Sequence, residues 1–261
     1  MIAKEKSGII KEQKPVVVSP QNSDVFDVIK SIANEKSAPV IDTTSMSISS
    51  TQNAQDKSQE TQVKGRFSEY KFLMPLIGKH QLCNALNAIG ISEVLMEYGY
   101  LIDKKSMEIG LSNVRWPGRM EILKTDGPIV IVDGAHNQNS IMMACQSIID
   151  NFVYSNVIIV FGATYGHDVA SMMQELLRLH PTIVPVKARH PKSVSCPDIY
   201  AEANIVGLKL VPGDYTVAQG LEIALARADS GGIIVSLGSL SVVAESIEHM
   251  RNMEPELYPE F

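Results

Sequence analysis

The sequence of 261 residues predicts an α/β fold in which a mostly parallel sheet forms the C-terminal part of the chain. From about residue 116 onward, short apolar strands alternate with helical segments. The strands are continuous runs of valine and isoleucine, such as PIVIVD at 128–133 and NVIIVF at 156–161. Continuous runs of this kind are typical of strands that lie in a parallel sheet and are covered by helices on both faces.

The same pattern predicts the order of elements in this part of the chain. Further strands are expected at 182–186, 208–211 and 231–237. Helices are expected between the strands and after the last one, at 138–152, 167–179, 196–205, 215–228 and 240–252. The change of pattern places a domain boundary between residues 111 and 118, which divides the chain into 1–113 and 114–261.

The N-terminal part contains fewer strands and one polar segment. The segment 45–63 is rich in serine, threonine and glutamine, which predicts an exposed loop or a mobile hairpin because little apolar surface is available to offset the entropy of ordering. Strands are expected at 15–19 and 67–78, and helices at 23–36, 80–99 and 103–110. One apolar face is predicted on the first helix, formed by Val25, Val28, Ile29 and Ile32.

Composition argues against several classes of protein. The net charge of −6 and the isoelectric point near 5.5 do not suit a surface that binds nucleic acid or an anionic membrane. No apolar run approaches the length of a signal peptide or a membrane span, so a cytoplasmic protein is expected. The three cysteines, Cys83, Cys145 and Cys196, are widely spaced and predict reduced thiols rather than a disulfide framework or a zinc site.

Ligands of such sheets bind beyond the carboxyl ends of the strands, which directs attention to the loops after residues 133, 161 and 237. The first of these loops, DGAHN, offers the carboxylate of Asp133, the imidazole of His136 and the amide of Asn137. Asp133 is placed to accept hydrogen bonds from ribose hydroxyls, but a turn with capping Asp and Asn side chains is an equal alternative. Upstream, RWPGR places Arg119 at the start of a strand, where its planar guanidinium suits a phosphate; a solvated surface arginine is the alternative.

Several motifs occur in a fixed order: HQLCN (80–84), NVRWPGR (113–119), VDGAHN (132–137) and GSL (238–240). Together with IAKEKSGIIKEQKPVVVS at 2–19, they resemble the folylpolyglutamate and dihydrofolate synthases, which belong to a wider group that includes the Mur ligases. The resemblance implies a partial central ATP-binding domain at 1–113. A Rossmann-like, mostly parallel-sheet domain of the Mur ligase C-terminal type would follow it at 114–261.

The resemblance also implies roles for individual residues. Gln81 and Asn84 match helix positions that face adenine, and Arg119 matches an arginine that reaches the phosphates of ATP. Asp133 matches an aspartate near the nucleotide, and His136 matches a histidine associated with the nucleotide and the incoming glutamate. In the family, ATP phosphorylates a carboxylate of the folate, and the amine of L-glutamate attacks the resulting acyl phosphate.

Two further assignments follow from the same resemblance. Lys6 matches a lysine that becomes carbamylated and helps to hold Mg²⁺, although a plain surface lysine is the alternative. Ser239 is placed near the glutamate pocket. The sequence departs from the family pattern at Gln138, where proline is usual, and at His167, where lysine is commoner before aspartate.

The family's glycine-rich phosphate-binding loop and its upstream metal ligands have no counterpart in the sequence. The chain is therefore expected to be inactive alone and to require a missing N-terminal half, and a monomer is expected. Two alternatives remain open. One is a fragment of a Mur-type peptide ligase, and the other is a non-catalytic nucleotide-binding or interaction module.

Overall fold

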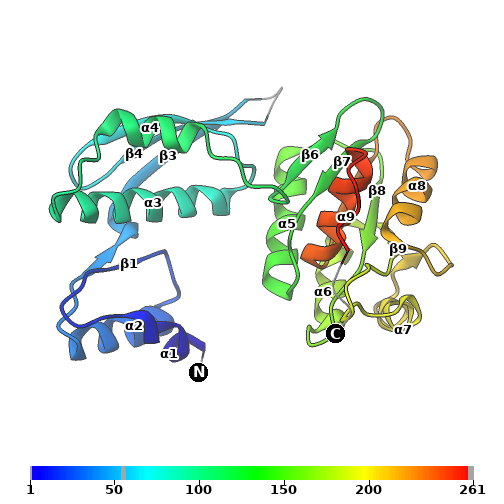
Figure 1. The fold of residues 1–261 in the computed structure, drawn as a ribbon, viewed down its shortest axis with the longest axis horizontal. Coiled ribbons are helices and arrows are strands. Elements are labelled where there is room, and N and C mark those ends of the chain that lie inside the picture. Colours follow the sequence, from blue (N-terminus) through cyan, green and yellow to red (C-terminus); the bar gives the residue numbers. More distant parts are fainter. Residues whose placement is uncertain (1, 54–56, 258–261) are drawn as a thin grey trace. The chain divides into compact units, whose positions relative to one another are not determined.

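A computed structural model describes residues 2–53 and 57–257 and divides the chain into two units (Figure 1). Unit 1 comprises the residues up to Pro75 together with Lys79–Arg115. Unit 2 comprises Leu76–Gly78 and the chain from Trp116 onward. No helix within the described residues is both long and apolar enough to cross a membrane.

Unit 2 is built on a six-stranded sheet with the strand order β10-β9-β8-β11-β7-β6. The strands are β6 (Glu121–Lys124), β7 (Ile129–Val132), β8 (Val157–Phe161), β9 (Thr182–Pro185), β10 (Lys209–Leu210) and β11 (Ile233–Leu237). Every neighbouring pair is parallel except β6 and β7, which are antiparallel. The predicted α/β fold with a mostly parallel sheet is therefore confirmed.

Helices cover both faces of this sheet (Figure 1). They are α5 (Gln138–Asn151), α6 (Val169–Leu176), α7 (Cys196–Val206), α8 (Val217–Arg227) and α9 (Leu240–Met250). Successive side chains of a strand point to opposite faces. In β8, for example, Ile159 packs into the core beneath α5, α6 and α7, whereas Ile158 and Val160 pack into the core beneath α8 and α9. Burial on both faces explains why the strand sequences are continuously apolar.

Unit 1 contains two small sheets and several helices. Its elements are α1 (Ile2–Lys6), the 3-10 helix η1 (Ser7–Ile9), β1 (Val16–Val18), α2 (Ser23–Glu35), β2 (Val40–Asp42), the 3-10 helix η2 (Thr43–Ser45), β3 (Ser47–Gln52), β4 (Gln59–Lys64), β5 (Glu69–Met74), α3 (Lys79–Glu97) and α4 (Lys104–Ser112). Strands β1 and β2 form a parallel pair, and β3, β4 and β5 form an antiparallel sheet in that order.

The segment 45–63 is not an exposed loop, which corrects the prediction. Most of it forms strands β3 and β4, so the alternative of a hairpin is the better description; residues 54–56 lie outside the described part. Buried and exposed residues alternate along β4, and Thr61 and Val63 face inward opposite Phe72 and Tyr70 of β5. The apolar side chains that stabilise this hairpin therefore come largely from a strand outside the segment, which is why its own composition concealed it.

The outer edge of the antiparallel sheet at β5 is capped by side chains of α4. Glu108 accepts a hydrogen bond from the backbone N–H of Lys71 at 2.8 Å, and Ser112 accepts one from the N–H of Leu73 at 3.2 Å. Residues four apart on a helix share one face, so α4 presents both acceptors to the same edge. This arrangement satisfies edge N–H groups that would otherwise be free to pair with another strand.

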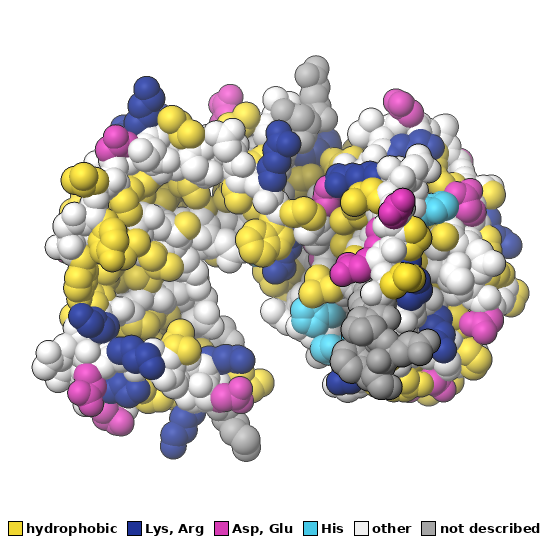
Figure 2. Space-filling view, in the orientation of Figure 1, with side chains coloured by type: hydrophobic (Ala, Val, Ile, Leu, Met, Phe, Trp, Pro, Cys, Tyr) yellow, Lys and Arg dark blue, Asp and Glu magenta, His cyan; other side chains and the backbone are white. Residues whose placement is uncertain are grey.

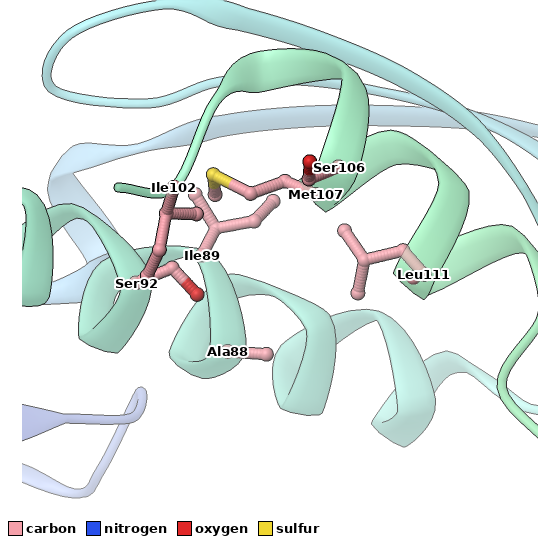
Figure 3. Close-up of a pocket in the computed structure, with 8 residues that line it drawn as sticks. Ala88, Ile89, Ser92, Ile102, Ser106, Met107 and Leu111 are labelled. Atoms are coloured by element: carbon pink, nitrogen blue, oxygen red, sulfur yellow. The ribbon is translucent and has the colours of Figure 1, made fainter. Parts of the chain in front are cut away.

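A cavity of about 270 Å³ lies between α3 and α4, and Figure 3 shows the side chains of Ile89, Met107 and Leu111 around it. Ala88, Ser92 and Gly110 also line the cavity. Their side chains are too small to fill the space between the two helices. The lining contains no ionisable side chain. We therefore assign no chemistry to this cavity.

The three free thiols differ in exposure and acidity, which predicts a selective reaction. Burial raises the pKa of Cys145 to about 12 and that of Cys196 to about 11, and both residues are inaccessible to solvent, whereas Cys83 is only partly buried. Because the thiolate is the nucleophile, we expect iodoacetamide at about pH 8 to alkylate Cys83 at least tenfold faster than Cys145. Peptide mass spectrometry measures the three rates, with the urea-unfolded chain as the control. Equal rates at Cys83 and Cys145 in the folded chain would contradict this assignment.

Candidate functional site

The three loops that the sequence singled out lie together at one edge of the unit 2 sheet. Their strands, β7, β11 and β8, are parallel neighbours, so their carboxyl ends point the same way. The loops are joined by hydrogen bonds: Gly238 donates its N–H to the carbonyl of Ala135 at 2.8 Å, and Gly162 donates to the carbonyl of Leu237 at 3.4 Å. The predicted position of the site, beyond the carboxyl ends of the strands, is thus a continuous surface.

Asp133 organises this surface through both of its carboxylate oxygens. Oδ2 accepts the backbone N–H of Met120 at 2.8 Å, and Oδ1 accepts the N–H of Ala135 at 2.9 Å. Met120 has a φ of 46°, in the left-handed region that residues with a side chain seldom adopt, and Gly118 has a φ of 73°. Gly118 also accepts the N–H of Gly134 at 2.7 Å. These contacts tie the turn at 118–120 to the loop that follows β7.

Burial dominates the electrostatics of Asp133, whose side chain is only 6% exposed. Burial raises the pKa of its carboxyl group, while the two backbone hydrogen bonds and the nearby charges of Arg119 and His136 oppose the increase. Both oxygens are already occupied by backbone donors. The structure therefore indicates that Asp133 positions the turn that carries Arg119. Of the two interpretations of Asp133, ribose binding or stabilisation of a turn, this role is nearer to the second.

Arg119 is the exposed cation of this turn. Its neighbours Gly118 and Met120 are buried, and its own N–H donates to the carbonyl of Trp116 at 3.3 Å. Within residues 2–53 and 57–257, its guanidinium forms no ion pair. A fixed backbone with an unpaired planar guanidinium is suited to bidentate binding of a phosphate or carboxylate.

His136 is half-buried and has a defined tautomer. Its Nδ1 lies 2.8 Å from the carbonyl oxygen of Gly134, and a carbonyl only accepts, so Nδ1 carries the proton. In the neutral imidazole, Nε2 is then left as an acceptor. Asn137, the next residue, caps α5: its side chain accepts the N–H of Ser140 at 2.9 Å. The DGAHN segment thus caps α5 through Asn137 and fixes which ring nitrogen of His136 carries the proton.

The structure adds His167 to the residues predicted from sequence. Its ring packs edge-on against that of His136, with the ring centroids 5.3 Å apart. His167 lies in the loop after β8 and lines a cavity of about 290 Å³ with Tyr165, Asp198 and Glu202. The position of FGATYGHD after a buried strand was the available signal, but nothing in the motif itself indicates that its histidine meets His136.

Ser239 lies at the third loop, where it caps α9. Its hydroxyl oxygen accepts the N–H of Val242 at 3.2 Å, and the residue is 4% exposed. The structure therefore explains this serine by helix capping, and its place near a glutamate pocket stays a prediction.

The two amides predicted to face adenine belong to unit 1. Gln81 is buried, its Oε1 accepts from Nδ2 of Asn84 at 2.9 Å, and its Nε2 lies 2.8 Å from Nε2 of His80. Asn84 is exposed and retains its own carbonyl oxygen for a further donor. Of the pair, Asn84 is the better placed to meet a ligand, and Gln81 orients it.

Lys6 is solvent-exposed, and Oε1 of Glu5 lies 3.7 Å from its Nζ. No group of three or more histidine, cysteine, aspartate or glutamate side chains suited to a metal ion occurs within the described part of the chain. Carbamylation of Lys6, which would add a carboxylate-like oxygen ligand, stays a prediction.

Comparison with known proteins shows which families the chain resembles. Residues 118–240 match the Mur ligase, glutamate ligase domain. The chain is 26% identical over 246 residues to the dihydrofolate synthase/folylpolyglutamate synthase of Bacillus subtilis, which covers 94% of this chain and 56% of that protein. It is 32% identical over 175 residues to a probable bifunctional folylpolyglutamate synthase/dihydropteroate synthase of Haloferax volcanii, which covers 66% of this chain and 20% of the relative.

The fold is shared with a solved structure of the same group. The Mycobacterium tuberculosis folylpolyglutamate synthase complexed with ADP superimposes with a TM-score of 0.84 at 21% identity, over 98% of this chain and 59% of that one. The chain thus spans little more than half the length of this protein. Residues 118–240 are thus similar to the glutamate ligase domain of the Mur ligases, and the chain as a whole is similar to the folylpolyglutamate and dihydrofolate synthases.

Proposed function

We propose that this chain supplies the glutamate ligase domain and part of the ATP-binding domain of a ligase that joins L-glutamate to a folate at the expense of ATP. The observation that carries the proposal is the pair of hydrogen bonds by which Asp133 holds the turn at 118–120, so that the charges of both Arg119 and His136 act on its carboxylate. The match of residues 118–240 to a glutamate ligase domain supports the reaction class.

The proposed reaction has two steps. The terminal phosphoryl group of ATP passes to a carboxylate of the folate, which forms an acyl phosphate and releases ADP. The amine of L-glutamate then attacks the acyl carbon, an amide forms, and phosphate leaves as the amine loses a proton. The protein contributes mainly by positioning and by stabilising charge on the transferring group.

Arg119 is assigned to the phosphoryl group, because its guanidinium is exposed and forms no ion pair with another described residue, while its backbone is fixed. His136 is assigned to the incoming glutamate. With Nδ1 bound to the carbonyl of Gly134, Nε2 is the ring nitrogen left to accept an N–H of the attacking amine. Asn84, oriented by Gln81, is assigned to the adenine. Ser239, at the start of α9, is assigned a position near the glutamate pocket.

Mg²⁺ accompanies ATP in this proposal, and Lys6, once carbamylated, is the ligand assigned to it from this chain. We also infer a monomer, in which polypeptide beyond the matched region supplies the phosphate cradle. Tetrahydrofolate and dihydropteroate are both candidate acceptors, and the experiment below distinguishes them.

The test joins this chain to the part of the Bacillus subtilis synthase that it does not match and measures phosphate release. We expect release that requires ATP, L-glutamate and one of the two folate acceptors together. A folded joined protein that releases no phosphate with either acceptor would refute the proposal. Release with a UDP-muramoyl peptide in place of the folate would assign the chain to the peptide ligases instead.

Within the joined protein, Arg119→Ala is expected to lower the rate of phosphate release about a hundredfold, because a guanidinium that stabilises developing charge is lost. Arg227→Ala is the matched control. Arg227 is also an exposed arginine of unit 2, but it lies in the last turn of α8, away from the three loops. Equal rates of phosphate release for the two variants would show that Arg119 does not take part in the reaction.

A further inference from the structure

A fourth loop reaches the edge of the unit 2 sheet that carries the candidate site. Strand β9 is parallel to its neighbour β8, so its carboxyl end lies at the same edge as those of β7, β8 and β11. The segment 186–194, called the fourth loop below, follows β9 and leads toward α7. The sequence motifs singled out three loops at this edge, and the fourth loop was not among them.

The fourth loop is held against the loop that follows β8. Thr164 and Ser193 form an isolated antiparallel bridge between the two loops. Beside this bridge, Tyr165 donates its N–H to the carbonyl of Lys192 at 2.8 Å. Ser193 is only 5% exposed, so the two loops meet at a buried junction. The position of each loop therefore depends on the other.

The same junction sets the place of His167. The carbonyl of Thr164 accepts the N–H of His167 at 3.3 Å, which closes a β-turn. Gly166 occupies the third position of this turn with a φ of 98°, where glycine is favoured. The ring of His167 then packs edge-on against that of His136, and Figure 2 shows histidine side chains (cyan) at the surface of unit 2. The turn that brings the two rings together is thus anchored on the fourth loop.

A buried carboxylate of α9 holds the fourth loop from its other side. Oε1 of Glu245 accepts the backbone N–H of Arg189 at 2.6 Å and lies 3.5 Å from Nε of the same arginine. The side chain of Glu245 is only 8% exposed. Burial raises the pKa of this carboxyl, and the N–H and the charge of Arg189 oppose the increase. Hydrogen bonds to a carboxylate are stronger than those between neutral groups, so this contact fixes the loop at Arg189.

Glu248 of the same helix contacts Arg189 in a different way. Its carboxylate pairs with the guanidinium of Arg189, and its Oε1 accepts the N–H of Glu256 at 2.9 Å. Of the two acids, Glu245 is the one that binds the main chain of the fourth loop. The pair therefore separates two effects, since loss of Glu248 removes a charge partner of Arg189 but leaves the loop held.

We propose that Glu245 is a positioning residue for the attack of L-glutamate. It holds the fourth loop through the N–H of Arg189, and the bridge at Thr164 passes this constraint to His167 and so to His136. This role rests on the proposed function, in which His136 is assigned to the incoming glutamate. Glu245 acts through the two loops and does not itself touch the reacting atoms.

NMR of the imidazole rings in the chain alone tests the positioning step without any ligase activity. In the wild type, a nuclear Overhauser effect is expected between ring protons of His136 and His167. In Glu245→Ala we expect this effect to be lost. In Glu245→Gln an amide oxygen still accepts the N–H of Arg189, so the effect is expected to persist. Glu248→Ala, the matched control, is expected to keep it as well.

An unchanged effect between the two rings in Glu245→Ala would overturn the proposal. Glu245→Met is the second variant, because it removes both carboxylate oxygens but nearly preserves the volume of the side chain. It gives the same comparison if the alanine variant does not fold. Thermal melting of each variant identifies those that fold.

Kinetics of the joined protein test the role of Glu245 in the reaction. In Glu245→Ala, the KM for L-glutamate is expected to rise about tenfold, because a small misplacement of a positioning group is costly. The KM for ATP is expected to stay within about twofold of the wild type, because Asp133 holds the turn of Arg119 independently. Glu245→Gln is expected to restore the KM for L-glutamate, and Glu248→Ala is expected to leave it unchanged.

The outcomes separate the role of Glu245 from the proposed function. Equal increases in the KM for L-glutamate and for ATP would indicate a general loss of structure and would overturn the positioning role. An unchanged KM for L-glutamate in an active Glu245→Ala protein would overturn it too. If the joined wild type releases no phosphate, the proposed function is rejected, while the ring contact in the chain alone still decides whether Glu245 positions the loop.

Discussion

Replacing Glu93 with alanine is expected to destabilise unit 1 by about 4 kcal/mol, because several hydrogen-bond donors would lose a buried acceptor. Glu93 lies on α3 and is fully buried. Its carboxylate accepts the backbone N–H of Arg66 at 3.0 Å, the N–H of Phe67 at 3.1 Å and the hydroxyl of Tyr70 at 2.9 Å. These contacts join the turn between β4 and β5 to the helix that covers the sheet.

Urea denaturation of the chain, combined with amide hydrogen exchange in β4 and β5, measures this loss. Glu97→Ala is the control, since Glu97 lies one turn further along α3 and pairs with Arg66 at the exposed surface, at 2.8 Å. A surface pair of this kind contributes about 1 kcal/mol or less. Similar losses for the two variants would show that the buried carboxylate does not stabilise the turn.

The second large effect is expected at Asp133. Asp133→Ala removes the acceptor for the buried N–H groups of Met120 and Ala135, at a cost of about 3 kcal/mol near neutral pH. The turn at 118–120 would also be released, so the rate of phosphate release should fall at least as far as it does in Arg119→Ala. Asp126→Ala, an exposed aspartate in the same unit, is the control for stability. A stable Asp133→Ala protein with unchanged activity would contradict the positioning role.

The effect of Asp133→Ala also depends on pH in a defined direction. Burial raises the pKa of this carboxyl in the folded protein above its ordinary value. Such a group stabilises the folded state most below the unfolded pKa, about 3.9, and this contribution is lost as the pH rises through the folded value. The difference in stability between the wild type and Asp133→Ala is therefore expected to grow as the pH is lowered from about 7 to about 4. Denaturation curves across this range measure it.

The elements of unit 2 were predictable because its strands are buried on both faces. Residues 129–132 and 157–161 are all valine, isoleucine or phenylalanine, and both runs form central strands of the sheet. The loops after them were predictable for the same reason, since parallel neighbouring strands must end at the same edge. Unit 1 was harder to predict because its antiparallel sheet alternates polar and apolar residues, and its hairpin at 47–64 depends on apolar partners from β5.

For the candidate functional residues too, the sequence predicted which residues are present, and the folded structure showed what they contact. Arg119, Asp133 and His136 were found from short motifs, because local sequence determines which side chains follow a strand. The role of Asp133 was not determined there. It depends on Met120, thirteen residues upstream, whose N–H reaches the carboxylate only when β6 pairs antiparallel with β7. His167 meets His136 because β7 and β8 are both neighbours of β11, an arrangement that no single segment encodes.

The sequence by itself thus determined the fold class, the edge of the sheet that carries the candidate site and the similarity of residues 118–240 to a glutamate ligase domain. These depend on composition and spacing within short segments. Only the tertiary structure decided which carboxylates accept hydrogen bonds from the backbone, as Asp133 and Glu93 do. The physical reason is that burial and hydrogen-bond partners are set by residues distant in sequence, so they exist only once the chain has folded.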